Sequence, residues 1–142
     1  MKPKLLLVAL LAVSISFLSS CKKDKSDDAD QVMSTEEVAA KILGKWSISS
    51  VQYNNHYNGT DHKETYPGTA TDYVEFKSDG LMYTSFRGVT DISTYKVKND
   101  KVITIDDDPA SIQEISDKVL RLYTKDETGT FGFTELMYNL NR

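Results

Sequence analysis

Cysteine is almost absent from this chain, in which Cys21 is the only one among 142 residues. A disulfide within one copy of the chain is therefore excluded, so a folded domain must rely on its hydrophobic core. Histidine is nearly as scarce, and both copies, His56 and His62, stand in one short segment. No serine stands in a nucleophile-elbow motif. With so few candidate nucleophiles and bases, the sequence predicts no enzymatic activity.

Basic residues are also in the minority. Residues 1–20 contain two lysines and no acidic residue, so the rest of the chain carries 15 basic against 21 acidic side chains. This acidic excess argues against nucleic acid as a partner, because binding to phosphates requires a basic surface. Long apolar runs are missing after Phe17, and none approaches the roughly 20 residues that a membrane-spanning helix needs.

The first 21 residues have the pattern of a signal peptide. Lys2 and Lys4 precede the apolar segment Leu5–Phe17, which is short for a membrane span. The segment leads into Leu18-Ser19-Ser20-Cys21, which resembles the lipobox of bacterial lipoproteins. That resemblance implies that diacylglycerol is attached to the Cys21 thiol and that the chain is cut before this residue. We therefore expect residues 1–20 to be removed and the acylated Cys21 to anchor the protein in a membrane.

A charged segment follows the expected anchor. Residues 22–33 are polar and lack apolar periodicity, which predicts a flexible tether. Lys22 is not the aspartate associated with retention in the inner membrane in enteric-type sorting, which favours the outer membrane. Ser26-Asp27-Asp28 resembles the acidic export signal of some surface lipoproteins and is equally typical of a solvated linker. The expected location is the cell envelope, and surface exposure stays open.

The folded domain is expected at residues 34–142 and begins with a short helix. Ser34 and Glu37 form the sequence pattern of a capping box, which predicts the first turn of that helix. Gly44 supplies a stop signal at the C-terminal end. Beyond Gly44 the apolar residues no longer follow a helical period and alternate with polar residues instead.

Eight extended runs follow Gly44, and short turns separate most of them. The hairpin signal at Asp79-Gly80 favours a primed turn. Because no helix intervenes, we expect an all-β antiparallel meander. Closing the sheet buries its apolar face, which predicts an eight-stranded up-and-down barrel; a two-sheet β-sandwich is the alternative that periodicity leaves open. The runs are Trp46–Tyr53, Asp72–Lys77, Leu81–Arg87, Ile92–Lys98, Lys101–Asp106, Ser111–Ile115, Val119–Lys125 and Thr130–Leu140.

Two motifs in these runs resemble lipocalins and the wider calycin group. Gly44-Lys45-Trp46 is similar to the Gly-x-Trp motif, and Tyr73–Gly80 resembles a hairpin of lipocalin-like bacterial lipoproteins. The resemblance covers about residues 36–142. It implies a lipocalin-like barrel that Trp46 plugs at one end beneath a basic side chain of a late strand. Arg121 and Arg142 are the candidates for that cation–π contact.

A ligand inside such a barrel would contact inward-facing side chains. Tyrosine hydroxyls there can orient a ligand, and they can equally be core groups with satisfied hydrogen bonds. Residues 54–70 form the longest segment without a clear pattern, and we interpret them as a loop. The resemblance to lipocalins implies that this loop lies over the barrel mouth, whereas its polar residues are also typical of an ordinary solvated loop. The candidate ligand-contacting residues are Tyr53, Phe76, Tyr83, Tyr95 and Tyr138 in the runs, and His56 and Tyr66 in the loop.

No cofactor or metal site is predicted. His56, Asp61 and His62 lack the spacing of a zinc motif, and residues 106–108 lack the pattern of a calcium-binding loop. The leading hypothesis is a membrane-anchored, lipocalin-like lipoprotein that binds a small, partly apolar ligand without catalysis. The alternative is an interaction or structural module with a filled barrel, whose loops contact an envelope protein or a glycan. The volume of the barrel interior discriminates between the two.

Overall fold

The structure, a computed structural model, describes residues 32–127 and 132–142, and contacts group residues 31–142 into one compact unit. The predicted signal peptide, the lipobox Leu18-Ser19-Ser20-Cys21 and most of the predicted tether lie outside the described residues. Lipidation of Cys21 therefore stays a prediction. Within the two described ranges, no helix combines the length and the apolar character needed to cross a membrane.

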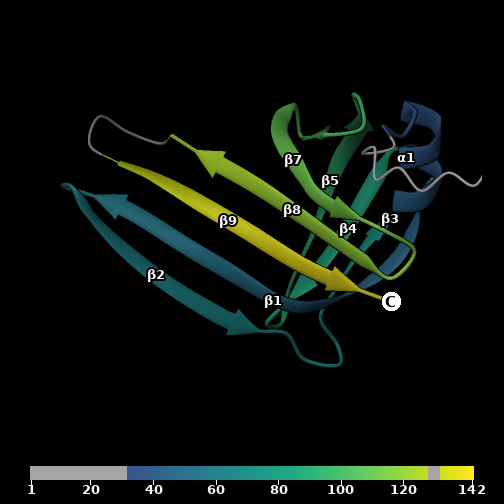
Figure 1. The fold of residues 1–142 in the computed structure, drawn as a ribbon. Coiled ribbons are helices and arrows are strands. Elements are labelled where there is room, and N and C mark those ends of the chain that lie inside the picture. Colours follow the sequence, from purple (N-terminus) through teal and green to yellow (C-terminus); the bar gives the residue numbers. More distant parts are fainter. Residues whose placement is uncertain (1–31, 128–131) are drawn as a thin grey trace, which may run out of the picture. The chain divides into compact units, whose positions relative to one another are not determined.

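Helix α1 (Thr35–Ile42) begins where the capping box predicts. The backbone N–H of Glu37 donates to the Ser34 hydroxyl at 3.2 Å, and the backbone N–H of Ser34 donates to the Glu37 carboxylate at 2.7 Å. The helix ends before Gly44, whose φ of 99° is rarely adopted by a residue with a Cβ. Val38 and Ile42 are fully buried, because α1 packs this face against one end of the sheet (Figure 1).

In the described residues, nine antiparallel strands form one sheet, and eight of them close into a barrel. Neighbours pair in the order β2–β1–β3–β4–β5–β6–β7–β8–β9, and β1 also pairs with β9. This additional pairing closes β1 and β3–β9 into a ring, which confirms the barrel and excludes the two-sheet sandwich. The strands are β1 (Gly44–Tyr57), β2 (Thr60–Pro67), β3 (Tyr73–Phe76), β4 (Leu81–Phe86), β5 (Val89–Val97), β6 (Val102–Ile105), β7 (Asp108–Ile115), β8 (Val119–Asp126) and β9 (Gly132–Asn141).

The interpretation of residues 54–70 as a loop is wrong. Strand β1 continues to Tyr57, the chain turns at Asn58 and Gly59, and β2 then pairs back along β1 as far as Ser50. The φ angles of Asn58 and Gly59 are 51° and 75°, and two positive φ angles in succession are typical of a type I′ hairpin turn. The side chains of β2 are almost all exposed, so the strand carries no apolar alternation that would predict it.

The turn at Asp79-Gly80 also differs from the primed turn that the sequence predicts. Gly80 is the residue of this hairpin with a positive φ, 85°, whereas a type I′ turn needs two in succession. The backbone N–H of Lys77 donates to the carbonyl of Leu81 at 2.8 Å, and that of Gly80 donates to the carbonyl of Lys77 at 3.2 Å. The connection is therefore a three-residue loop, residues 78–80, that ends in a left-handed glycine.

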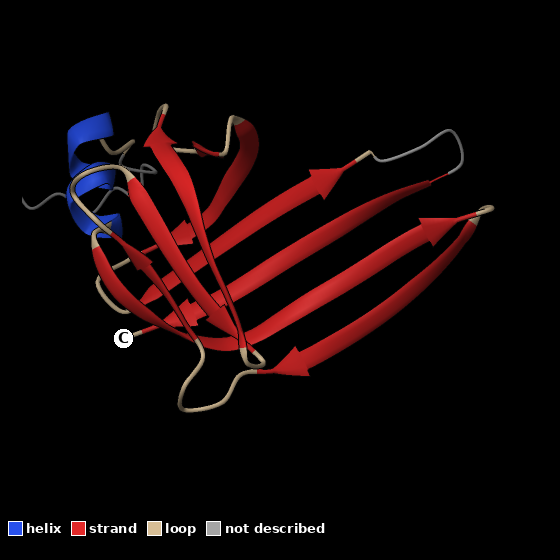
Figure 2. Cartoon of the chain, turned by 180° about the vertical axis from the view of Figure 1, so that it is seen from behind, coloured by secondary structure: helices blue, strands red, loops and turns tan. Residues whose placement is uncertain are grey.

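A β-bulge divides β1 into two parts. Trp46 and Ile48 point into the core, and the register with β9 shifts between Ile48 and Ser50, so that Val51 and Tyr53 point inward beyond the shift. Past the bulge, four strand segments project beyond the rest of the barrel as a curved sheet (Figures 1 and 2). We call it the sheet extension, and it consists of residues 50–57, 60–67, 122–126 and 132–139.

Candidate functional site

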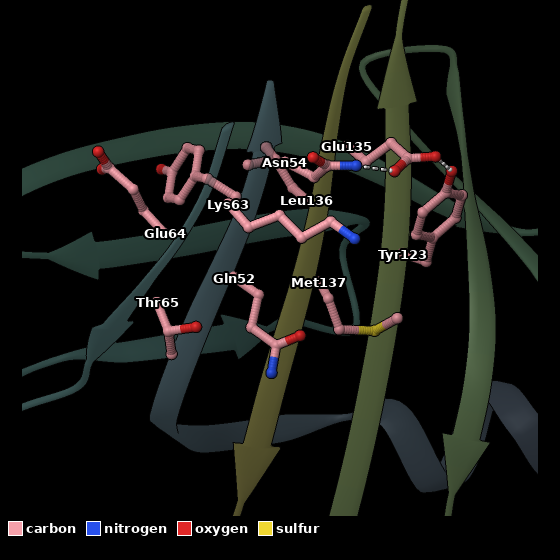
Figure 3. A pocket seen from close by; sticks show the side chains of 10 residues that line it. Gln52, Asn54, Lys63, Glu64, Thr65, Tyr123, Glu135, Leu136 and Met137 are labelled. Carbon is pink, nitrogen blue, oxygen red and sulfur yellow. Dashed lines mark hydrogen bonds between the residues drawn. The ribbon is translucent and has the colours of Figure 1, made fainter. Parts of the chain in front are cut away.

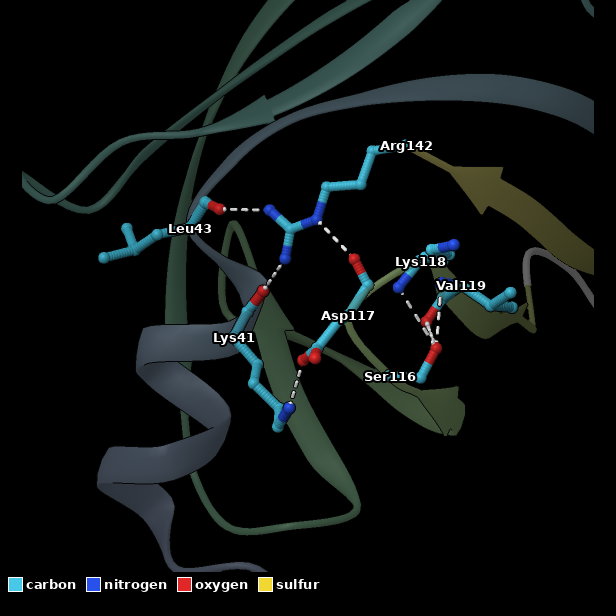
Figure 4. Close-up of polar contacts among 7 residues, drawn as sticks. All are labelled: Lys41, Leu43, Ser116, Asp117, Lys118, Val119 and Arg142. Carbon is cyan, nitrogen blue, oxygen red and sulfur yellow. Dashed lines mark hydrogen bonds and ion pairs between the residues drawn. The ribbon is translucent and has the colours of Figure 1, made fainter.

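The end of the barrel beside α1 is closed by Trp46 and Arg142. The Trp46 side chain is fully buried, and its Nε1–H donates to the carbonyl oxygen of Ile42 at 2.8 Å. The guanidinium carbon of Arg142 lies 3.8 Å from the centre of the Trp46 ring. Arg142 also donates to the carbonyl oxygens of Lys41 and Leu43 at 2.7 and 2.9 Å (Figure 4). These contacts tie the end of the chain to the end of α1 and leave the opposite end as the mouth.

Arg121, the other candidate for the cover over Trp46, lies on the outside of the barrel. It forms an ion pair with Glu114 at 2.9 Å, and about half of its side chain is exposed. Its neighbours Leu120 and Leu122 are buried, so the alternation along β8 directs Arg121 outward. The candidate role of Arg121 is therefore corrected: the basic group that stacks on Trp46 belongs to Arg142.

The barrel interior keeps an inner cavity of about 210 Å³. One part of its wall is apolar, and the other carries hydroxyls and one carboxylate. Burial raises the pKa of Tyr138, whose phenol lies in this wall. The apolar lining comes from Val74, Met82, Ile105, Leu122 and Leu140, and the polar lining comes from Thr84, Asp91, Ser93, Thr124 and Tyr138.

A wider mouth cavity of about 630 Å³ adjoins the inner one, because Thr84 and Asp91 line both. Aromatic side chains shape its wall. The rings of Tyr53 and Tyr66 meet edge to face, with their centres 5.4 Å apart. The guanidinium of Arg87 lies 4.5 Å from the centre of the Tyr66 ring. The mouth therefore combines aromatic surface with charged groups, whereas the inner cavity is more apolar.

Asp72 links two backbone segments at the edge of this mouth. Its carboxylate is 2% exposed and accepts hydrogen bonds from the backbone N–H groups of Thr69 at 2.8 Å and Arg87 at 2.9 Å. The backbone hydrogen bond from Thr69 is the main cause that holds the pKa of Asp72 below its usual value. Arg87 has a φ of 51°, a left-handed conformation that costs energy for a residue with a Cβ. The hydrogen bond that Arg87 donates to Asp72 thus helps to hold the β4–β5 turn at the mouth.

Five of the seven candidate ligand-contacting residues lie inside the barrel. Tyr138 lines the inner cavity, and Tyr53 and Tyr66 line the mouth. Phe76 and Tyr95 belong to the packed end, where their rings meet edge to face with centres 4.9 Å apart. The Tyr95 hydroxyl donates to the carbonyl of Lys77 at 2.8 Å, so it is a satisfied core group.

The other two candidates lie on the outer face, and the expectation for them is corrected. The ring of His56 stacks on Phe133, with centres 4.8 Å apart, and its Nδ1 lies 2.7 Å from the Asp61 carboxylate. Tyr83 stands between the inward-facing Met82 and Thr84, and it pairs with the exposed Ile92. Neither side chain lines the inner or the mouth cavity.

The two histidines do not come together with Asp61 in one cluster. His56 pairs across the strands with Asp61, whereas His62 pairs with Asn55 and points to the opposite face. In the part of the chain that the structure describes, no three His, Cys, Asp or Glu side chains are grouped to hold a metal ion.

Four polar residues of the inner cavity were missed by the sequence reasoning. Thr84 follows the buried Met82 by two positions, and Asp91 and Ser93 precede the inward-facing Tyr95 by four and two. Alternation alone places these side chains inward. They were missed because inward positions were identified by apolar side chains, and these three are polar. Thr124 is found in the same way, two positions after Leu122.

Comparison with known proteins agrees with this geometry. The family model of the lipocalin-like domain matches residues 42–122, which includes Trp46 and the strands that form most of the barrel. The chain matches none of the curated proteins with which it was compared.

Proposed function

Because the chain belongs to the lipocalin-like domain family, we propose that it holds a small, partly apolar molecule in its barrel without catalysis. The observation that carries this proposal is the inner cavity of about 210 Å³, which shares Thr84 and Asp91 with the mouth cavity. A filled barrel, as the alternative interaction module requires, would have no such space. The cavity therefore favours ligand binding over that alternative.

The lining of the two cavities suggests how a ligand lies. Apolar side chains such as Leu122 and Leu140 surround the inner end, where an apolar group loses its contact with water. Hydroxyls and charged groups increase toward the mouth, where Arg87 and Asp91 offer hydrogen bonds. A molecule of about 300 Å³ or more exceeds the inner cavity and extends into the mouth. The proposed ligand thus has an apolar end and a polar end.

We also propose that the protein is attached to the outer membrane through acylated Cys21. The support is the lipobox Leu18-Ser19-Ser20-Cys21 after a basic and apolar leader. Replacement of Cys21 by Ala should abolish labelling of the protein by radioactive palmitate in its host. Continued labelling of that variant would contradict the anchor, and removal of the domain from intact cells by protease would place it at the surface.

Ligand binding is tested by filling the passage between the two cavities. Thr84→Phe places a ring where both cavities meet, and Thr90→Phe adds the same ring on the exposed side of β5. With residues 31–142, the fluorescent probe anilinonaphthalene sulfonate should bind the Thr84→Phe variant at least about tenfold more weakly than the wild type. The Thr90→Phe variant should bind it as the wild type does.

Equal binding of the probe to both variants would contradict a ligand site in the barrel. Thermal unfolding of both variants checks that each is folded. Native mass spectrometry of the domain purified from its own host then gives the mass of any retained ligand. A ligand that is lost from the Thr84→Phe variant alone identifies the molecule that the barrel holds.

A further inference from the structure

The outer face of the sheet extension carries a cleft of about 340 Å³ that is separate from the inner cavity. Cross-strand pairing brings its polar side chains together, because Asn54 pairs with Lys63 on one side and with Glu135 on the other. Gln52 pairs in the same way with Thr65 and Met137. Figure 3 shows these side chains together over the extended strands.

The Glu135 carboxylate is fixed at one side of this cleft. It accepts hydrogen bonds from the Tyr123 hydroxyl at 2.7 Å and from the Asn54 side-chain amide at 2.8 Å (Figure 3). The bond from Tyr123 is the main cause that lowers the pKa of Glu135, so the group stays charged at neutral pH. A carboxylate accepts about four hydrogen bonds, and two of these positions are therefore free for a ligand.

The side-chain amide of Asn54 lies in the cleft with its hydrogen-bonding capacity only partly used. Its side-chain oxygen is buried and has no hydrogen-bond partner among the described residues. An unsatisfied buried acceptor costs free energy and calls for an explanation, such as a donor that arrives with a ligand. Lys63, the direct cross-strand neighbour of Asn54, extends over the cleft in Figure 3. Movement of this flexible side chain would expose the oxygen to a ligand.

The charges around the cleft disfavour an ionic ligand. Lys63 and Glu135 contribute opposite charges on the same face. An anion would meet the Glu135 carboxylate, and a cation would meet the ammonium group of Lys63. A neutral ligand with many hydrogen-bonding groups meets neither penalty.

We propose that this cleft binds a neutral saccharide through Glu135, Asn54 and Gln52. Adjacent sugar hydroxyls donate and accept, so one can donate to the free positions of Glu135 while its neighbour bonds the Asn54 or Gln52 amide. The Tyr123 ring borders the cleft and offers an apolar surface to the C–H groups of a sugar ring. The site lies on the opposite side of the sheet from the proposed barrel ligand and does not depend on it.

Titration with neutral trisaccharides tests the proposal. Cellotriose, maltotriose and tri-N-acetylchitotriose are added in turn to ¹⁵N-labelled residues 31–142, and backbone amide shifts are followed. At least one of the three should cause saturable shifts at residues 52–54, 63–65 and 135–137. Glu135→Gln and Gln52→Ala should each weaken that binding roughly tenfold, because each removes hydrogen bonds to the sugar. Glu114→Gln, the same change at an exposed ion pair on β7, should leave it unchanged.

The proposal is overturned if none of the three sugars gives saturable shifts, or if both cleft variants bind as tightly as the wild type. Shifts confined to residues of the inner cavity would overturn it as well. Gln52→Ala keeps the test valid if Glu135→Gln fails to fold, because the Gln52 side chain is exposed. The probe experiment with Thr84→Phe reports on the barrel alone, so failure of either site is recognised separately.

Discussion

The guanidinium carbon of Arg142 lies 3.8 Å from the centre of the Trp46 ring, so the last residue of the chain covers a tryptophan at the start of the first strand. The same guanidinium accounts for two carbonyl groups near the end of α1, those of Lys41 and Leu43. Helix ends leave such carbonyls without a partner, and charged donors bind them strongly. One side chain thus joins the helix, the first strand and the chain end.

Replacement of Arg142 by Ala should therefore destabilise the domain. We expect a loss of about 1–3 kcal/mol of unfolding free energy, from the cation–π contact and the charged hydrogen bonds together. Arg121→Ala is the matched control, and it should cost less than about 1 kcal/mol because its ion pair with Glu114 is exposed. Urea unfolding followed by the fluorescence of Trp46, the sole tryptophan, measures both. Equal midpoints for the two variants would refute the role of Arg142.

The capping box predicted α1. Closing the sheet buries its apolar face, which favoured a barrel, although periodicity left the two-sheet sandwich open. Alternation and turn signals predicted eight of the nine strands in the described residues. They failed at β2, because this strand is exposed on both faces and its residues need not alternate. The Asn58-Gly59 turn was the available signal, since Asn-Gly between extended runs predicts a hairpin.

Alternation could not predict which face of the sheet each side chain beyond the bulge points to. Counting in steps of two from Trp46 and Ile48 directs His56 inward. The register shift between Ile48 and Ser50 reverses this, so that Tyr53 faces the mouth and His56 stacks on Phe133 outside. The volumes of the cavities likewise depend on packing between distant strands, which a sequence pattern does not contain.

Two glycines should respond differently to a Cβ atom. In Gly68→Ala the new Cβ would lie 1.8 Å from the carbonyl oxygen of Ile48, so the backbone must shift, at a cost of roughly 2–3 kcal/mol. Gly59 has open space around it, and Gly59→Ala should cost only about 1 kcal/mol for its left-handed φ. Denaturant unfolding measures the unfolding free energy of both variants. A loss in Gly68→Ala no larger than that in Gly59→Ala would show that this close approach is not required.

Stability at acid pH should depend on Asp72. Its folded-state pKa is lowered, so its contribution is fully present above the unfolded value of about 3.9 and is lost as the pH falls through the folded value. Asp72→Asn should remove this part of the pH dependence, and it should also loosen the turn that Arg87 begins. Urea midpoints between neutral and acid pH measure the effect, with Asp107→Asn on the exposed turn between β6 and β7 as the control. If the urea midpoint depends on pH as steeply in Asp72→Asn as in the wild type, Asp72 is not the source of this pH dependence.

Stability at alkaline pH should depend on Tyr138 in the wall of the inner cavity. Burial raises its folded-state pKa, so the neutral phenol contributes stability below the unfolded value of about 10, and this is lost as the pH rises toward the folded value. The unfolding free energy of Tyr138→Phe should be within about 0.5 kcal/mol of the wild-type value at neutral pH. Above pH 10 the variant should lose less stability than the wild type does. Tyr83→Phe on the outer face is the control and should keep the wild-type alkaline profile.

Because a ligand in the inner cavity buries Tyr138 further, the ionisation of Tyr138 in an absorbance titration should move to still higher pH when the barrel is occupied. An ionisation that is unchanged by a bound ligand would place that ligand outside the inner cavity.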